Sequence, residues 1–167
     1  MLYHDIIDTT KKGDSKKLLI LLNKLEECQL EQEMYISMLW AIITNNTKII
    51  KMILKLGINI NNTYYRGHVL LSTAIRENKV KIAKQFIKLG ANPNLKDKSG
   101  KTPLHYAVFN KTNDNIKLVK ILLKAGSNPN EKDLKGKSAL DYAKDFKRNE
   151  IIYFINKINL SKIKNVT

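Results

Sequence analysis

The stretch that decides the fold is GKTPLHYAVFNKTNDNIKLVKILLKAGSNPN, residues 100–130. It contains a tight turn, a short helix that opens with Thr-Pro, a second helix over residues 116–124, a glycine that stops this helix, and an Asn-Pro-Asn turn. A helix–turn–helix unit of this size cannot bury its apolar face by itself. We therefore expect copies of the unit on both sides of it in the chain.

The copies are visible as small and turn-forming residues that recur at a fixed spacing. Ala41, Ala74 and Ala107 follow one another at intervals of 33 residues, and Ala143 comes 36 residues later. The same intervals separate the members of three further series, which are Gly57, Gly90 and Gly126; Gly67, Gly100 and Gly136; and Asn61, Asn94 and Asn130. A period of 33 residues with helix–turn–helix chemistry is typical of a solenoid of stacked repeats.

The residues that open the first helix of each unit carry a family resemblance. The segment TPLHYA (102–107) matches the helix-opening motif of the ankyrin-repeat family, and looser versions are VLLSTA (69–74), ISMLWA (36–41) and SALDYA (138–143). The sequence resembles this family over roughly residues 31–157. The resemblance implies an all-α ankyrin-repeat solenoid of stacked helix–turn–helix units with hairpin-like turns. It also implies that Thr102 and His105 hydrogen-bond to each other and to the adjacent turn, which makes His105 a structural histidine.

We expect a single domain over residues 1–157, with about three full repeats between two helical caps. The N-terminal cap has two helices that are separated by a turn at Gly13-Asp14-Ser15. The cap, the three repeats and the C-terminal cap repeat are expected at residues 1–30, 31–66, 67–99, 100–135 and 136–157. Residues 158–167 are expected to be a tail.

The chain is strongly basic and almost free of cysteine. Its formal net charge is +15, and lysine supplies all but three of the basic residues. This balance permits attraction to nucleic acid, to an anionic membrane or to an acidic protein, and it also fits the codon bias of an AT-rich genome. The single cysteine, Cys28, favours a reducing compartment, and we expect neither a signal peptide nor a membrane span. The sequence therefore predicts a soluble, cytoplasmic monomer, and secretion as an effector stays compatible with it.

The residue types needed for catalysis do not form a recognisable site. The histidines His4, His68 and His105 lie at spacings unsuited to a metal, and one cysteine cannot build a thiolate zinc site. The sequence contains no phosphate-cradling glycine loop and no nucleophile elbow. We expect no enzymatic activity, no cofactor, no metal and no small-molecule substrate.

The resemblance implies that partners contact the tips of the hairpins and the exposed ends of the inner helices, which together form the concave face of the solenoid. Tyr64-Tyr65-Arg66 at a hairpin tip has the composition of a binding hot spot. The alternative that these aromatic side chains pack within the hairpin stays open. The residues we expect to contact a protein are Tyr64, Tyr65, Arg66, His68, Arg76, Lys98, Lys101, Phe109, Leu134, Lys135, Lys137 and Phe146.

A second surface is predicted on the outer helices. Lysines there recur at positions i, i+3 and i+7, so that each trio occupies one helical face and stacking places three trios side by side. These nine residues, the lysine wall, are Lys48, Lys51, Lys55, Lys81, Lys84, Lys88, Lys117, Lys120 and Lys124. A solvated face without a partner accounts for the same pattern, because long lysine side chains also cover apolar surface.

Two functions follow from these two surfaces. The first is a non-enzymatic module that binds an acidic protein across the concave face, as an adaptor, a scaffold or an inhibitor, including the immunity and host-interaction types. In it, Tyr65, Phe109 and Phe146 supply apolar anchors, and the arginines and lysines of the face steer the partner. The alternative is an electrostatic binder of nucleic acid or of an anionic membrane through the lysine wall.

Overall fold

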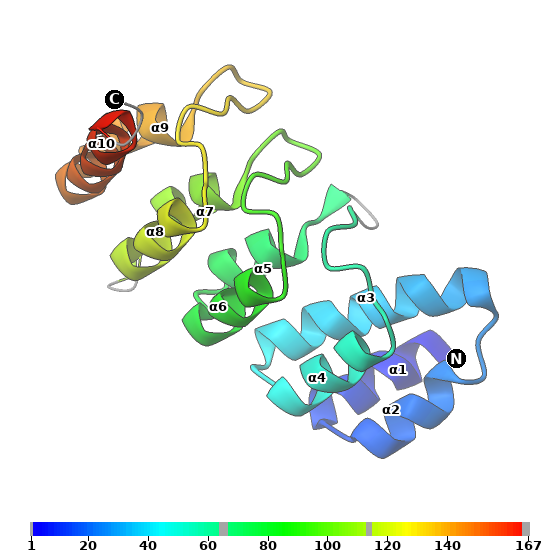
Figure 1. Ribbon diagram of the computed structural model, residues 1–167. Helices are drawn as coiled ribbons and strands as arrows, with labels where there is room; N and C mark the ends of the chain where they lie inside the picture. Colours follow the sequence, from blue (N-terminus) through cyan, green and yellow to red (C-terminus); the bar gives the residue numbers. More distant parts are fainter. Residues whose placement is uncertain (1, 64–66, 113–114, 165–167) are drawn as a thin grey trace.

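Ten helices in two layers make up the part of the protein that the computed structural model describes, residues 2–63, 67–112 and 115–164 (Figure 1). The inner layer contains α1 (Leu2–Lys12), α3 (Glu27–Ile43), α5 (Leu70–Arg76), α7 (Pro103–Phe109) and α9 (Ala139–Asp145). The outer layer contains α2 (Ser15–Leu22), α4 (Thr47–Lys55), α6 (Val80–Lys88), α8 (Asn115–Lys124) and α10 (Asn149–Lys164). The expected all-α class is confirmed, and α1 and α10 lie at opposite ends of the stack.

The turns between paired helices follow from local side-chain chemistry. The Asn46 side chain caps α4 by accepting a hydrogen bond from the backbone N–H of Ile49 at 3.2 Å. The residue before this cap, Asn45, has a φ of 57°, and asparagine tolerates this left-handed conformation better than most residues. Asn78 occupies the same place before α6, with a φ of 54°. The turn before α8 is longer, as expected from the three extra residues between Ala107 and Gly126.

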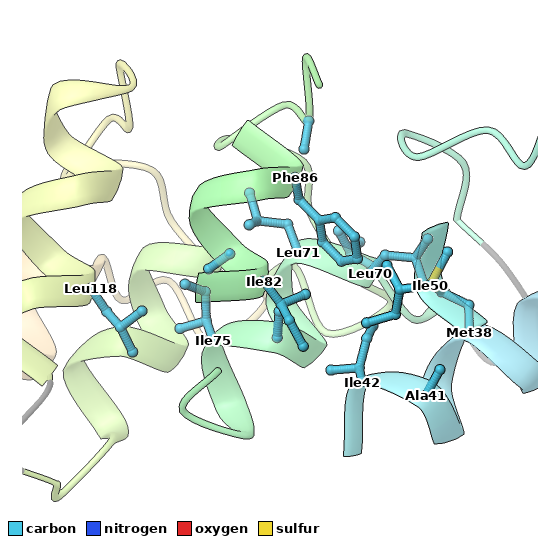
Figure 2. Packing of buried hydrophobic residues seen from close by; sticks show 14 of the residues in the cluster. Met38, Ala41, Ile42, Ile50, Leu70, Leu71, Ile75, Ile82, Phe86 and Leu118 are labelled. Atoms are coloured by element: carbon cyan, nitrogen blue, oxygen red, sulfur yellow. The ribbon is translucent and has the colours of Figure 1, made fainter. Parts of the chain in front are cut away.

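The core runs along the whole stack between the two layers. Ala41, Ala74, Ala107 and Ala143 are completely buried, which confirms that the inner helices approach one another at these small side chains. Figure 2 shows the larger side chains beside them, from Leu118 through Ile75 and Ile82 to Ile42. Each repeat therefore buries its apolar face against its neighbours, as a solenoid requires.

The two ends of the stack differ from the expected boundaries. Helix α3 begins at Glu27, so the expected junction between residues 30 and 31 falls inside a helix that is 17 residues long, against seven for α5, α7 and α9. No glycine or proline interrupts residues 27–43, which allows one continuous helix. At the other end, α10 continues to Lys164, past the expected start of the tail at residue 158. None of the helices in the described ranges is long and apolar enough to cross a membrane.

Two described loops project from the same side of the stack, and we call them fingers (Figure 1). The first finger is residues 91–102 and leads from α6 to α7; the second is residues 127–138 and leads from α8 to α9. The backbone N–H of Leu134 donates to the carbonyl of Ser99 at 3.0 Å and joins the two fingers. A Cβ atom on Gly100 would lie 2.8 Å from the nitrogen of Leu134, so only glycine permits this approach.

Asparagine side chains join the bases of successive loops. Asn94 donates to the carbonyl of Gly126 at 3.0 Å and accepts from the backbone N–H of Asn128 at 2.7 Å. Asn61 makes the same pair of bonds with the carbonyl of Gly90 and the N–H of Asn92. The regular spacing of these asparagines therefore reflects hydrogen bonds between repeats.

Candidate protein-binding surface

The first finger is held in shape by the carboxylate of Asp97. Its Oδ1 accepts hydrogen bonds from the backbone N–H groups of Ser99 (2.8 Å) and Lys101 (3.0 Å) and from the Ser99 hydroxyl (2.7 Å). Its Oδ2 accepts a hydrogen bond from the Tyr106 hydroxyl on α7. Burial by itself raises the pKa of Asp97, but the hydrogen bonds outweigh it and hold the pKa below its ordinary value of 3.8. An ionised carboxylate thus ties the finger to the helix that follows it.

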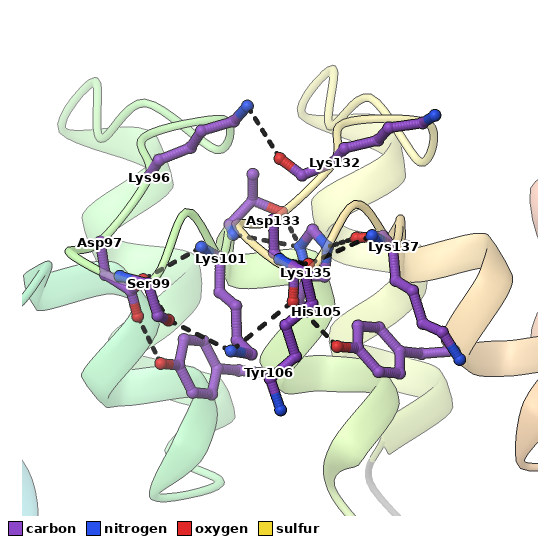
Figure 3. A network of polar contacts seen from close by, with 12 residues as sticks. Lys96, Asp97, Ser99, Lys101, His105, Tyr106, Lys132, Asp133, Lys135 and Lys137 are labelled. Atoms are coloured by element: carbon purple, nitrogen blue, oxygen red, sulfur yellow. Dashed lines mark hydrogen bonds and ion pairs between the residues drawn. The ribbon is translucent and has the colours of Figure 1, made fainter.

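The second finger repeats this arrangement around Asp133. Its Oδ1 accepts from the N–H groups of Lys135 (2.9 Å) and Lys137 (3.2 Å), and its Oδ2 accepts from the Tyr142 hydroxyl at 2.9 Å. The Nζ of Lys101 lies 3.6 Å from Asp133 Oδ2, so a lysine of the first finger pairs with the carboxylate of the second. The two fingers are therefore one connected, preorganised unit (Figure 3).

His105 connects the two fingers from below, at the start of α7. Its Nδ1 accepts a hydrogen bond from the Thr102 backbone N–H at 3.1 Å, which leaves the ring proton on Nε2. The Nε2–H group donates to the carbonyl of Lys137 at 3.2 Å (Figure 3). Burial lowers the pKa of His105, so the ring is neutral at neutral pH. The expected structural role of His105 is confirmed by these contacts.

Four aromatic side chains, from α7, from α9 and from Phe146 at the C-terminal cap of α9, form an aromatic cluster on the inner layer. Phe109 is central to it, with its ring centroid 4.8 Å from that of Tyr142, 5.9 Å from that of Phe146 and 6.3 Å from that of Tyr106. Tyr106, Phe109 and Tyr142 are half-buried, whereas Phe146 keeps 49% of its surface exposed. Phe109 and Phe146, both predicted as apolar anchors of the concave face, are thus in contact within one patch.

The cationic side chains of the two fingers differ in how strongly neighbouring groups engage them. Lys101 is mostly buried between the fingers, with 17% of its side chain exposed. Lys137 lies 2.6 Å from the Asp145 carboxylate and 5.7 Å from the Tyr142 ring centroid. Lys98 and Lys135 are exposed on the two fingers, beside Leu134, which has 79% of its surface exposed. The finger tips therefore present an exposed leucine between two exposed lysines.

The remaining predicted contact residues are near the preceding repeat. Tyr64, Tyr65 and Arg66 lie outside the described residues. His68 is half-buried just before α5, and Arg76 at the end of α5 pairs with Glu77 at 3.3 Å. Arg76 is thus on the inner layer, one repeat away from the aromatic cluster.

The sequence reasoning missed the two Asp–Tyr pairs that shape the fingers. Asp97 and Tyr106 are nine residues apart, and Asp133 and Tyr142 repeat this spacing 36 residues later. This shared spacing is the signal that could have found them. Burial and the hydrogen bond to Asp97 raise the pKa of Tyr106 to about 12, so its hydroxyl remains a donor at neutral pH.

The described residues include a cavity, and it lies away from the two fingers. No group of three or more His, Cys, Asp or Glu side chains among them could hold a metal ion. A cavity of about 360 Å³ lies between the N-terminal ends of α8 and α10, at the end of the hairpins away from the fingers. It does not adjoin the aromatic cluster.

The comparisons with known proteins agree with this geometry. A family model described as ankyrin repeats, in three copies, matches residues 70–163. These residues include α5 to α10, both described fingers and the whole aromatic cluster. No curated protein matches the sequence.

Proposed function

The chain belongs to the ankyrin-repeat family, and from this premise we propose that it binds an acidic protein through its concave face, the fingers together with the exposed side of the inner helices. Ankyrin repeats are generally protein–protein interaction modules, and the family is typically non-enzymatic. The proposal goes further, to one face of the molecule and to one charge class of partner.

The observation that carries the proposal is the aromatic cluster with its cationic border. Phe146 remains 49% exposed although Phe109 and Tyr142 pack beside it, which leaves an apolar edge that a partner can cover. Aromatic side chains in the centre of a contact and basic side chains at its rim are the composition of protein interfaces with strong hot spots. Lys98 and Lys135 are exposed on the two fingers and favour an acidic partner.

The rigidity of the fingers also favours binding. Asp97 and Asp133 each fix their finger through backbone and tyrosine hydrogen bonds, and Leu134 hydrogen-bonds across to Ser99. A surface that is ordered before binding loses little conformational entropy when a partner arrives. We propose that the module acts by occluding its partner or by holding it as a scaffold.

Parallel affinity capture with matched variants tests this proposal. Three baits are used, and the captured proteins are identified by mass spectrometry. The first bait is the wild type, and the second is a concave-face variant with Phe146→Ala, Lys98→Glu and Lys135→Glu. The third is a control with Lys51→Glu and Lys84→Glu on the outer helices. We expect a defined acidic protein that the wild type and the outer-helix control retain and the concave-face variant loses. Retention of the same proteins by the concave-face variant would overturn the proposal.

A further inference from the structure

The outer helices carry a second surface that the concave face does not use. Helices α4, α6 and α8 contain nine lysines, no arginine and no acidic residue. Eight of these lysines are exposed, and only Lys120 is half-buried, where its ammonium group lies 3.8 Å from the centroid of the Phe154 ring. The lysine wall is therefore displayed to solvent, on the layer opposite to the aromatic cluster (Figure 1).

The spacing of the lysine wall makes its charges act together. Each trio spans about 10 Å along its helix, because a helix rises about 1.5 Å per residue. Packed helices lie about 8–10 Å apart. Both spacings are close to the Debye length of about 8 Å at physiological ionic strength, so neighbouring lysines reinforce one another's potential.

The last lysine of two of the trios is followed in the sequence by an exposed leucine. Leu56 follows Lys55 and has 41% of its surface exposed, and Leu89 follows Lys88 and has 52% exposed. The two leucines occupy equivalent positions, one repeat apart, immediately before Gly57 and Gly90. Leucine gains nothing from a phosphate backbone, but it gains free energy from the apolar boundary of a bilayer.

The three helices that carry the lysine wall lack the side chains that stack on bases or read their edges, although lysine itself can contact phosphates. Within α4, α6 and α8 the only aromatic residue is Phe86, which is fully buried, so these helices offer no ring on which a base could stack. They also lack arginine, the residue that most often reads guanine. Lysine side chains flanked by leucines instead fit the headgroup layer of a bilayer.

We propose that the lysine wall and its two leucines, Leu56 and Leu89, form a docking surface for an anionic phospholipid membrane. The lysines contact lipid phosphates and acidic headgroups, and the leucines enter the boundary between headgroups and acyl chains. Since the fingers and the aromatic cluster belong to the other layer, a membrane-bound molecule keeps its concave face open for a protein.

Vesicle sedimentation of the purified full chain tests this proposal without any protein partner, so its result is independent of the proposed function. The vesicles contain phosphatidylcholine alone, phosphatidylcholine with phosphatidylserine, or phosphatidylcholine with phosphatidylglycerol. We expect binding to both anionic mixtures at physiological ionic strength and none to phosphatidylcholine alone. Binding to only one anionic headgroup would also support the surface and would identify its lipid.

Three variants of exposed residues locate the binding. Each basic residue at an anionic bilayer changes the partition coefficient by about fivefold, so Lys51→Glu with Lys84→Glu should lower it by at least about tenfold. Lys98→Glu with Lys135→Glu removes the same charge from the fingers and should leave the partition coefficient within about twofold, because the fingers project away from the outer helices (Figure 1). Leu56→Asn with Leu89→Asn should lower it severalfold while the charge stays the same.

Four results would overturn the proposal. The first is that neither anionic vesicle is bound, and the second is that the finger variant loses as much vesicle binding as the lysine-wall variant. The third is that the leucine variant loses no vesicle binding. The fourth is that labelled duplex DNA or single-stranded RNA is bound more tightly than the vesicles under the same conditions. The last result would assign the lysine wall to nucleic acid.

Discussion

At the scale of single residues, His105 serves both its own helix and the next repeat. Its Nδ1 satisfies the backbone N–H of Thr102 at the start of α7, and its Nε2–H satisfies the carbonyl of Lys137 in the second finger. The ring is completely buried and lies edge-on to Tyr142. Removing it leaves one unpaired polar group in each of two repeats.

The first prediction concerns this loss. His105→Ala should lower the free energy of unfolding by about 2–4 kcal/mol, because a cavity is added to the unpaired groups. His105→Asn should cost less, since an asparagine oxygen can still accept from the Thr102 N–H. Urea denaturation of the three proteins measures the difference. An alanine variant as stable as the wild type would show that the histidine contacts contribute nothing.

The second prediction concerns pH. Burial holds the pKa of His105 in the folded state below its ordinary value of 6.5. As the pH falls through 6.5, the unfolded chain binds a proton at this histidine and the folded chain does not, so the free energy of unfolding falls. The slope from His105 reaches at most about 1.4 kcal/mol per pH unit.

His105→Gln provides the matched control for this pH effect. It removes the titrating ring and retains His4 and His68, so their contributions cancel in the comparison. As the pH is lowered from about 7.5 to about 5.5, the free energy of unfolding of the wild type should fall relative to that of the variant. Asp97 and Asp133 have lowered pKa values, so the stability they add is present above about pH 3.8 and is lost only at more acid pH. Stability curves of the two proteins that stay parallel between about pH 7.5 and about pH 5.5 would contradict the prediction.

At the scale of elements, each described finger contains a glycine with a positive φ, and the two glycines differ in what surrounds them. Gly100 and Gly136 have nearly the same backbone conformation, with φ of 75° and 73°. A Cβ atom on Gly100 would collide with the backbone of Leu134, whereas one on Gly136 meets nothing within 4 Å. The two positions thus share the strain of a positive φ and differ in the contact with the next finger.

This difference gives the third prediction. Gly100→Ala should destabilise the protein by about 1–3 kcal/mol more than Gly136→Ala, because the finger contact must open to admit the methyl group. Thermal unfolding of both variants measures this difference in stability. The free-energy cost of placing alanine at a positive φ is common to both variants and cancels in the comparison. Equal melting temperatures would show that the fingers do not need to pack against each other.

The elements also show what the sequence could and could not predict. The alanine and glycine spacing predicted the paired helices of the repeats, because close packing and left-handed turns each admit few residue types. The length of α3 was missed, since no local signal distinguishes a helix of 17 residues from a shorter one preceded by a link. The pairing of Lys101 with Asp133 was also missed, because it joins different repeats and has no spacing of its own.

For the candidate surface, the sequence predicted which side chains share a face better than it predicted how exposed each side chain is. Phe109 and Phe146 were expected on one face, and their rings lie 5.9 Å apart there. Phe109 is half-buried against Tyr142, whereas Phe146 is exposed. This difference in exposure depends on the packing between α7 and α9. Sequence pattern specifies a shared face, and only the tertiary structure specifies which side chain on it remains uncovered.

At the scale of the whole molecule, the net charge of +15 acts on every encounter with an acidic protein. Long-range attraction raises the rate of association, and dissolved salt screens it. Apolar contacts such as those expected at Phe146 are insensitive to this screening. The two contributions can therefore be separated by kinetics.

The fourth prediction follows from that separation. Raising the salt concentration from about 0.05 M to about 0.5 M should lower the association rate constant with the captured acidic protein by about tenfold or more, and should change the dissociation rate constant much less. Surface plasmon resonance measures both constants. A salt effect confined to dissociation would place the charges inside the contact instead of around it.

The most direct test of the central proposal is site-specific photocrosslinking in cells. A photoreactive amino acid replaces Leu134 on the second finger, Phe146 just after α9, or Lys84 on the outer face of α6, all of which are exposed. We predict a crosslink to the same acidic protein from positions 134 and 146 and none to it from position 84. A crosslink to that protein from position 84, without one from positions 134 and 146, would contradict binding through the concave face.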